Sequence, residues 1–321
     1  MVELLTPSRK APLPAGKFRR ADITADGSPR ATVAFARLET LWLNTGTLCN
    51  IECGHCYIDS SPTNDRLAYL TPDDARPFFS EAARLGAKEI GFTGGEPFMN
   101  PDMIALADES LAAGFTVLIL TNAMRPMMRP RLARGLAELR SEYGERLALR
   151  VSLDHYTARL HDEERGPGGF AETLHGLQWL AGNGFNVSVA GRKRWGESEA
   201  ATRAGFARLF AEKDLSIDAA NPARLVLFPE MDVRADTPEI TTACWGILGK
   251  SPEGVMCATS RMVVKRKGAA APAVVACTLI PYDDAFELGA TIIDALGPVA
   301  LNHPHCSKFC VLGGASCSPP G

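Results

Sequence analysis

Residues 45–62 read TGTLCNIECGHCYIDSSP, and this stretch decides how the rest of the sequence is interpreted. It contains Cys49, Cys53 and Cys56, at offsets of four and three. Thiolates are the usual ligands of iron–sulfur clusters, and a tight loop of this kind can bind three corners of a four-iron cube. An iron without a protein ligand keeps an open coordination position for a small molecule, as in catalytic metal sites. The spacing alone also fits a zinc knuckle, with His55 or a distant residue as the fourth ligand.

The composition predicts that these cysteines lie in a reducing compartment of the cell. Of 321 residues, 46% are hydrophobic and 22% are charged, which is ordinary for a soluble globular enzyme. The net charge of -3 provides no basic face for nucleic acid, and no run approaches the roughly 18 apolar residues of a membrane span. Residues 1–30 have basic residues but no apolar core, so they are not a signal peptide. We therefore expect a cytoplasmic protein without nucleic-acid or membrane partners, whose nine cysteines are metal ligands or catalysts rather than disulfides.

Short apolar runs alternate with amphipathic stretches from residue 40 onward. The predicted strands are residues 40–46, 89–95, 115–123, 147–154, 185–192 and 223–229, and the predicted helices are residues 70–87, 100–114, 130–143, 170–184 and 199–213. Such alternation implies a parallel sheet with right-handed crossovers. Six units fall short of the eight in a closed barrel. The predicted fold is therefore α/β, an open, partial (β/α)6 TIM-like barrel.

The alternation stops after about residue 229, which predicts a domain boundary within residues 229–242. Residues 1–36 are predicted to be a flexible or draped leader, residues 37–229 the partial barrel, and residues 230–321 a small cysteine-rich domain. Six of the nine cysteines lie in this last part: Cys244, Cys257, Cys277, Cys306, Cys310 and Cys317.

A second motif ends the second predicted strand. It reads FTGGEPFMN, residues 92–100, and supplies Gly94, Gly95, Glu96 and Pro97. Paired glycines let the backbone approach a ligand closely, and Glu96 can pair with a cationic amino group. A plain strand-to-helix turn is the other interpretation, because Gly and Pro are common in such turns.

With both motifs in this order, the chain resembles the radical S-adenosylmethionine (SAM) superfamily over about residues 37–229. The resemblance implies a [4Fe-4S] cluster held by Cys49, Cys53 and Cys56. It also implies that SAM chelates the open iron through its amino and carboxylate groups, with residues 94–97 binding the amino group.

Further SAM contacts follow from the same resemblance. Tyr57 stands where the family has an aromatic residue that contacts adenine. Thr121 and Asn122 end the third predicted strand, and Ser152 and Asp154 end the fourth, where the family often places ribose and methionine contacts. Sites in barrels form at these strand ends, although polar residues there can also simply cap loops.

The chemistry is implied by the family as well. An electron from the reduced cluster breaks a carbon–sulfur bond of SAM, and the resulting 5'-deoxyadenosyl radical abstracts a hydrogen atom from a small-molecule or peptide substrate. A reducing partner such as flavodoxin or ferredoxin is part of this expectation. The protein's share is to orient the reactants and to exclude water.

The tail resembles the twitch or SPASM extension of these enzymes, which carries auxiliary [4Fe-4S] clusters. Cys257 and Cys277 are predicted to lie at the two ends of a β-hairpin, and Cys306, Cys310 and Cys317 follow at spacings of x3 and x6. In the full family form the corresponding cysteines are spaced x2 and x5, and the hairpin is shorter. The resemblance implies one auxiliary cluster on the first four of these cysteines, with Cys317 able to replace one of them. A zinc site is the alternative.

Cys244, beside Trp245, precedes the hairpin. It can be an auxiliary ligand or a core thiol, but it can also donate a hydrogen atom, because an S–H bond is weaker than most C–H bonds. Donation from the face opposite abstraction inverts a stereocentre, and radical epimerases acting on peptides or aminoglycosides use a cysteine in a similar place. Epimerisation is therefore the leading reaction. Oxidation or thioether or C–C cross-linking of a ribosomal peptide, and a non-catalytic iron–sulfur or zinc protein, are the alternatives.

Other candidates near the predicted strand ends or the tail cysteines carry a weaker signal: Arg192, Lys193, Arg194, His155, Tyr156, Glu230, His303 and His305.

Overall fold

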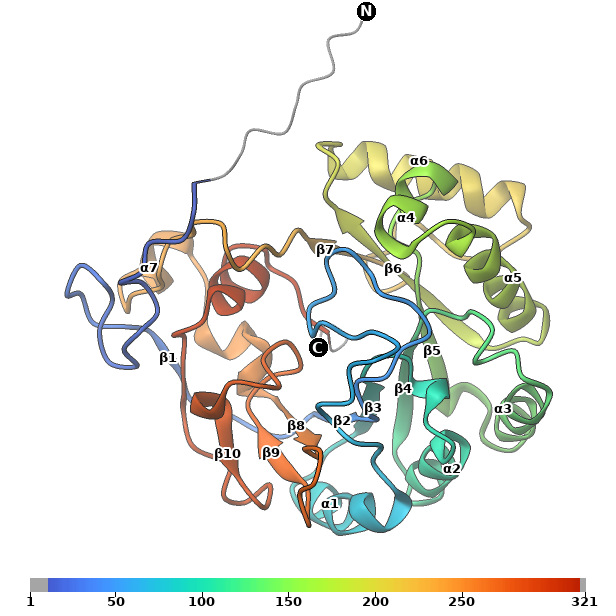
Figure 1. Cartoon of the computed structure of the whole chain (residues 1–321), viewed down its shortest axis with the longest axis horizontal. Coiled ribbons are helices and arrows are strands. Elements are labelled where there is room, and N and C mark those ends of the chain that lie inside the picture. Colours follow the sequence, from blue (N-terminus) through green and yellow to red (C-terminus); the bar gives the residue numbers. More distant parts are fainter. Residues whose placement is uncertain (1–10, 318–321) are drawn as a thin grey trace, which may run out of the picture.

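The computed structural model describes residues 11–317, and its centre is a curved, nine-stranded sheet (Figure 1). Six strands pair in parallel in chain order: β2 (Thr40–Asn44), β3 (Glu89–Thr93), β4 (Thr116–Thr121), β5 (Leu147–Ser152), β6 (Asn186–Lys193) and β7 (Leu225–Pro229). Their runs of Val, Leu and Ile are buried, as expected for strands covered on both faces. The sheet ends at β7 on one side and β10 on the other. It is therefore open, which confirms the predicted partial barrel.

Helices cover the outer face of this sheet (Figure 1). They are α1 (Pro72–Arg84), α2 (Met103–Ala112), α3 (Pro130–Tyr143), α5 (Gly169–Gly182) and α6 (Glu199–Glu212), while the short α4 (Ala158–Arg165) contacts the loop after β2. Thr71 begins α1 with a capping box, in which its hydroxyl accepts from the Asp74 N–H and the Asp74 carboxylate accepts from the Thr71 N–H. Apolar residues of the helices and strands form one core cluster between the two layers. All five predicted helices are present, whereas α4 was not predicted.

The C-terminal region continues the same sheet beyond β2. Strand β8 (Ser260–Val264) pairs in parallel with β2, and β9 (Ala273–Val275) pairs antiparallel with β8, which confirms the predicted hairpin. Strand β10 (Glu287–Gly289) then pairs with β9. A second apolar cluster packs around these strands and includes Trp42 of β2. The short helix α7 (Cys244–Leu248) contributes Cys244 and Trp245 to it, and the π-helical turn η6 (Cys306–Val311) also belongs to it.

The N-terminal segment lies along this C-terminal region. Its strand β1 (Thr32–Val33) pairs with β11 (Val299–Ala300). Arg30 and Glu239 form a buried ion pair at 2.5 Å, and the Glu239 carboxylate also accepts from the N–H groups of Phe18 and Ala25. Residues 11–33 are therefore draped over the protein, while the start of the predicted leader, residues 1–10, lies outside the described residues.

Residues 11–317 contain neither a disulfide nor a helix that could span a membrane. None of the nine cysteines, all of which lie in this range, forms a disulfide. No helix in the range has the length and apolar character to cross a membrane.

Candidate active site

A cavity of about 150 Å³ lies where the carboxyl ends of the barrel strands meet the C-terminal region. This is the end at which parallel barrels build their sites. The barrel strands, the loops that follow them and helix α4 contribute Cys49, Cys53, Cys56, Tyr57, Ile58, Ser60, Thr93, Gly94, Gly95, Leu120, Thr121, Asn122, Ser152, Asp154, Arg165, Ala190, Arg192 and Phe228. The C-terminal region contributes Thr278, Leu279 and Cys317.

The three thiols of the first motif all line this cavity. Burial raises the pKa of Cys49 to about 12, and the charge of Glu96 adds to this effect. Burial also raises the pKa of Cys53. The Ser60 N–H donates to Cys56 Sγ at 3.3 Å. Cys49 and Cys53 therefore need a positive partner to lose their protons, and the irons of a cluster would supply it.

The geometry of the thiols fits a cluster better than a single zinc ion. Zinc holds each thiolate at about 2.3 Å, so its ligands must converge on one point. Among residues 11–317, no three His, Cys, Asp or Glu side chains converge in this way. A four-iron cube instead spreads its ligands over separate corners, as three thiols around one cavity wall can provide.

The paired glycines of the second motif bring two loops together. Gly94 has a φ of +144°, and a Cβ on it would lie 2.5 Å from the Gly46 carbonyl oxygen. A Cβ on Gly95 would lie 2.2 Å from the Leu48 oxygen. The Gly95 and Glu96 N–H groups donate to the Gly46 and Leu48 oxygens. The glycines therefore fix residues 94–96 against the segment that leads into the cysteines, besides lining the cavity themselves.

Glu96 is buried behind the cavity wall, as is Pro97. Its carboxylate accepts from the Thr121 hydroxyl and the Asn122 N–H, both at 2.8 Å, and from the Phe98 N–H at 3.2 Å. Burial nevertheless raises its pKa to about 7, because these donors only partly replace water. The carboxylate thus orients Thr121 and Asn122, which line the cavity, and a cation beside it would stabilise its charged form.

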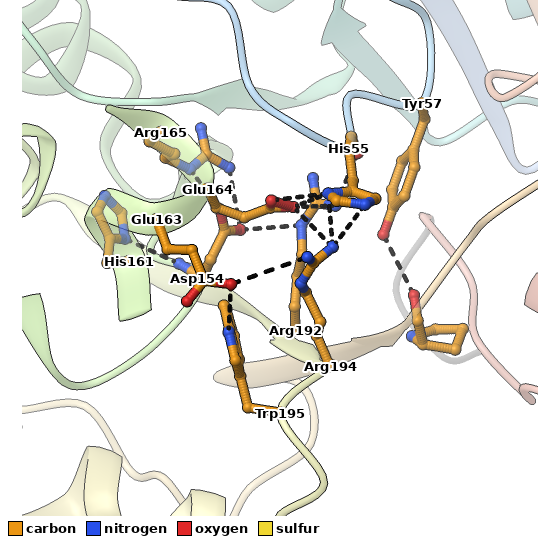
Figure 2. Close-up of polar contacts among 11 residues, drawn as sticks. His55, Tyr57, Asp154, His161, Glu163, Glu164, Arg165, Arg192, Arg194 and Trp195 are labelled. Carbon is orange, nitrogen blue, oxygen red and sulfur yellow. Dashed lines mark hydrogen bonds and ion pairs between the residues drawn. The ribbon is translucent and has the colours of Figure 1, made fainter. Parts of the chain in front are cut away.

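Asp154 is held by two arginines at the cavity wall (Figure 2). Its carboxylate accepts from Arg165 Nε at 2.7 Å and Nη2 at 3.1 Å, and from Arg192 Nε at 3.1 Å. Although burial opposes ionisation, the two guanidinium groups hold the pKa of Asp154 far below its usual range. Both guanidinium groups line the cavity, where they can bind an anionic group of a ligand, and Arg192 also pairs with the Glu164 carboxylate at 3.7 Å.

Helix α4 also fixes the cysteine loop, through His55 (Figure 2). The Glu164 carbonyl accepts from the Gly54 N–H at 2.9 Å, and the Glu164 carboxylate lies 3.0 Å from His55 Nδ1. Arg192 Nη1 donates to the His55 carbonyl at 2.8 Å. Arg194 Nη1 lies 2.7 Å from His55 Nε2. His55 therefore contacts protein groups that hold the loop between Cys53 and Cys56.

Tyr57 lies between the barrel and the C-terminal region. The Arg192 guanidinium stacks 4.7 Å above its ring, and the ring of Phe309 approaches edge-on at 6.1 Å. Burial raises the pKa of Tyr57 to about 12. Its ring also lines the cavity, together with Ser152, as the family resemblance leads one to expect for SAM contacts.

The tail cysteines are divided between two cavities. Cys257, Cys277, Cys306 and Cys310 line a small, almost wholly apolar cavity with His305. The hairpin places the first two, and an offset of four in η6 places Cys306 and Cys310 on one side of a helical turn. Burial raises the pKa of Cys257 to about 11 and that of Cys306 to about 12. The four predicted auxiliary ligands therefore lie together, in a site where thiolates need metal charge.

The other two tail cysteines, Cys317 and Cys244, do not line this second cavity. Cys317 is buried in the wall of the first cavity, where Thr278 Oγ1 donates to its sulfur at 3.4 Å. Burial raises the pKa of the Cys317 thiol. Cys244 lies outside both cavities, at the start of α7, and its sulfur accepts from the Thr241 N–H at 3.4 Å. The structure does not bring the predicted hydrogen donor to the three thiols.

Of the weaker candidates, only Arg192 lines the first cavity. Lys193 pairs with Glu199, Tyr156 donates to Glu197, and His155 Nδ1 lies 2.9 Å from the Thr157 hydroxyl. Glu230 lies outside the cavity, and His303 lines a neighbouring groove with His305.

The sequence reading missed Arg165 and Glu164, because it missed α4. This helix has eight residues and no apolar stripe, so hydrophobic periodicity could not reveal it. A signal was present in Thr157 before it and Gly166 after it, the residue types that commonly bound a helix.

Comparison with known proteins agrees with this geometry. Residues 43–192 match the family described as the Radical SAM superfamily. An AdoMet-dependent heme synthase of Methanosarcina barkeri is 34% identical over 142 residues, which are 44% of this chain and 38% of the relative. The subtilosin biosynthesis protein AlbA of Bacillus subtilis is 30% identical over 143 residues, 44% of this chain and 30% of AlbA. Mycofactocin maturase MftC of Mycobacterium tuberculosis is 33% identical over 137 residues, 43% of this chain and 33% of MftC.

These matches span about a third of the length of the curated relatives. Solved structures resemble more of the chain. Streptococcus suis SuiB bound to S-adenosylmethionine superposes with a TM-score of 0.59 at 13% identity, over 81% of this chain and 65% of SuiB. The anSMEcpe structure with bound AdoMet superposes with a TM-score of 0.54 at 13% identity, over 84% of this chain and 80% of anSMEcpe. At such identities the likeness concerns the fold alone. With the motif thiols gathered in one cavity and the family match across them, residues 43–192 form a domain of the radical SAM superfamily.

Proposed function

We propose that this protein is a radical SAM enzyme that modifies a peptide. The observation that carries the proposal is the single cavity that holds Cys49, Cys53 and Cys56 together with the GGEP backbone. Enzymes of this superfamily use a [4Fe-4S] cluster and SAM, which together supply a radical that abstracts a hydrogen atom from the substrate. In this chain Cys49, Cys53 and Cys56 would hold that cluster.

The remaining cavity residues suit the parts of SAM. Glu96 provides a buried negative charge for an ammonium group, next to the backbone of residues 94 and 95. Arg165 and Ser152 supply donors for a carboxylate. Tyr57 offers a ring face and edge for adenine, and Thr121 and Asn122 offer polar groups for the ribose. These residues bind and orient the ligand, while the C-terminal region covers the cavity and excludes water.

The second cavity supports one auxiliary cluster. Cys257, Cys277, Cys306 and Cys310 would supply its four ligands, which completes a [4Fe-4S] cluster. A zinc ion there remains the alternative, and metal analysis separates the two.

A peptide is the proposed substrate because of the relatives. One is named for the biosynthesis of the bacteriocin subtilosin and another as a mycofactocin maturase. A further solved structure with the same fold is titled as SuiB bound to the precursor peptide SuiA. Epimerisation of a stereocentre is the proposed reaction, and oxidation or cross-linking of the peptide are its rivals. The reductant would be a flavodoxin or a ferredoxin.

Anaerobic reconstitution tests the proposal. We expect about eight irons and eight sulfides per chain, since two [4Fe-4S] clusters contain that many. With SAM and dithionite, the protein should form 5'-deoxyadenosine. Replacing Cys49, Cys53 and Cys56 together with Ala should halve the iron and abolish this product, whereas Cys244→Ala should retain both.

Two results would contradict the proposal. Zinc in place of iron would indicate a metal-binding scaffold. A full iron content without any 5'-deoxyadenosine would indicate a non-catalytic iron–sulfur protein.

A further inference from the structure

The wall that the C-terminal region contributes to the first cavity contains one thiol, Cys317. Its position is fixed from two sides. The buried Arg150 of β5 donates from Nη1 to the Cys317 carbonyl oxygen at 2.7 Å, and Thr278 Oγ1 donates to Cys317 Sγ at 3.4 Å. Because the sulfur accepts the Thr278 hydrogen, the thiol's own hydrogen is not used in that contact and can point into the cavity.

Cys317 does not line the second cavity, although its charge helps to raise the pKa of Cys277 and of Cys310, which do. Four other thiols line that cavity, and four ligands complete a four-iron cube. Cys317 instead shares the first cavity with Cys49, Cys53 and Cys56.

The first cavity has a second feature that indicates an organic ligand near these groups. Ser60 lines it and is 3% exposed, yet its hydroxyl has no hydrogen-bond partner among the described residues. A buried hydroxyl without a partner costs about 1–3 kcal/mol, which a polar group of a bound molecule would recover. A thiol that lines the same cavity therefore faces a space built for a ligand.

We propose that Cys317 donates a hydrogen atom to the substrate radical in this cavity, an inference that rests on the proposed function. The S–H bond breaks homolytically, and the hydrogen atom forms a new C–H bond on the substrate carbon. The sulfur is left as a thiyl radical. One electron and one proton, from the flavodoxin-type or ferredoxin-type reductant and from water, restore the thiol.

This assigns to Cys317 the role that the sequence predicts for Cys244. The Cys244 sulfur accepts from both the N–H and the hydroxyl of Thr241 at 3.4 Å and lies outside the cavity. Cys244 is therefore a matched control, since it is also a thiol of the C-terminal region without a place in either thiol cavity.

The test needs SAM but no substrate. In deuterated water the Cys317 thiol carries deuterium, and this thiol lines the cavity that would hold SAM. We expect the 5'-deoxyadenosine formed with dithionite to contain deuterium in the wild type and in Cys244→Ser. In Cys317→Ser the deuterated fraction should fall severalfold.

Iron content and the electron paramagnetic resonance spectrum of the reduced protein provide a readout that does not depend on turnover. Both should be unchanged in Cys317→Ser. Loss of half of its iron would show that Cys317 is a cluster ligand and would overturn the inference, as would an undiminished deuterium label. If the wild type itself forms no 5'-deoxyadenosine, the proposed function fails first, and this inference fails with it.

Discussion

Two opposing effects of its surroundings set the pKa of Glu96, since burial raises this pKa and hydrogen bonds to the carboxylate lower it. Its three hydrogen-bond donors come from Phe98, Thr121 and Asn122, and burial still outweighs them. The sequence predicted that Glu96 would pair with an amino group. The structure adds that the same carboxylate orients two other predicted SAM contacts, so its replacement affects more than one interaction.

The raised pKa of Glu96 predicts a pH dependence of stability in the protein without cofactors. Because the folded-state pKa of about 7 exceeds the ordinary value of 4.5, the neutral form stabilises the fold at low pH. This contribution is lost as the pH rises from about 4.5 through about 7. Glu96→Gln should therefore gain stability relative to the wild type across this range, by about 3 kcal/mol.

Urea unfolding of both proteins at several pH values measures this difference. Subtracting the two free energies of unfolding cancels the other titrating groups, such as His161 and His303. A difference that stays constant with pH would show that Glu96 titrates normally.

Helix α4 joins the first cavity to the cysteine loop, although the sequence analysis did not predict this helix. Two neighbouring residues of α4 make these contacts. Glu164 contacts Gly54 and His55 of the cysteine loop, and Arg165 donates to the Asp154 carboxylate at the cavity. Glu163, one position earlier, lies at the surface, where it accepts from Trp195 Nε1 at 3.4 Å and pairs with Arg194 at 3.8 Å.

This arrangement predicts different effects for two adjacent substitutions. Glu164→Gln removes a buried charged partner of His55 and should lower the free energy of unfolding by about 1–3 kcal/mol. Glu163→Gln should change it by less than about 0.5 kcal/mol. Urea unfolding of the apoprotein measures both, and retention of iron during gel filtration reports how firmly the loop holds its cluster. Equal effects of the two substitutions would show that α4 does not fix the loop.

At the scale of elements, the sequence predicted what depends on local pattern. The strands of the barrel, the capped helix α1 and the hairpin between Cys257 and Cys277 all have period, cap or turn signals that are local. The sequence could not show that β8 would pair in parallel with β2, because that contact joins residues more than 200 positions apart. The same limit applies to Cys317, whose place in the first cavity depends on the tertiary contacts of Thr278 and Arg150.

The whole molecule is held together at its N-terminal side by the Arg30–Glu239 ion pair. Both side chains are buried, and Arg30 also donates to the carbonyl oxygens of Arg20, Ile23 and Leu301. Removing one member leaves the other charge buried without its partner, which costs about 3–5 kcal/mol.

Glu239→Gln should therefore destabilise the folded protein by an amount of this order in urea unfolding. Asp22→Asn is the matched control, because it removes the partner of Arg20 in an ion pair that lies at the surface. We expect that control to leave the stability nearly unchanged. If Glu239→Gln were equally mild, the draped segment would contribute little to the stability of the C-terminal region.

The pairing of β8 with β2 determines how this protein can be divided. A fragment that ended at residue 229 would keep every barrel strand, yet one whole side of β2 would lose its hydrogen-bond partners. Such a bare strand edge is a template for intermolecular association. The region that carries the second set of thiols is thus built into the sheet as its continuation, and excising it would yield an aggregating fragment rather than a smaller enzyme.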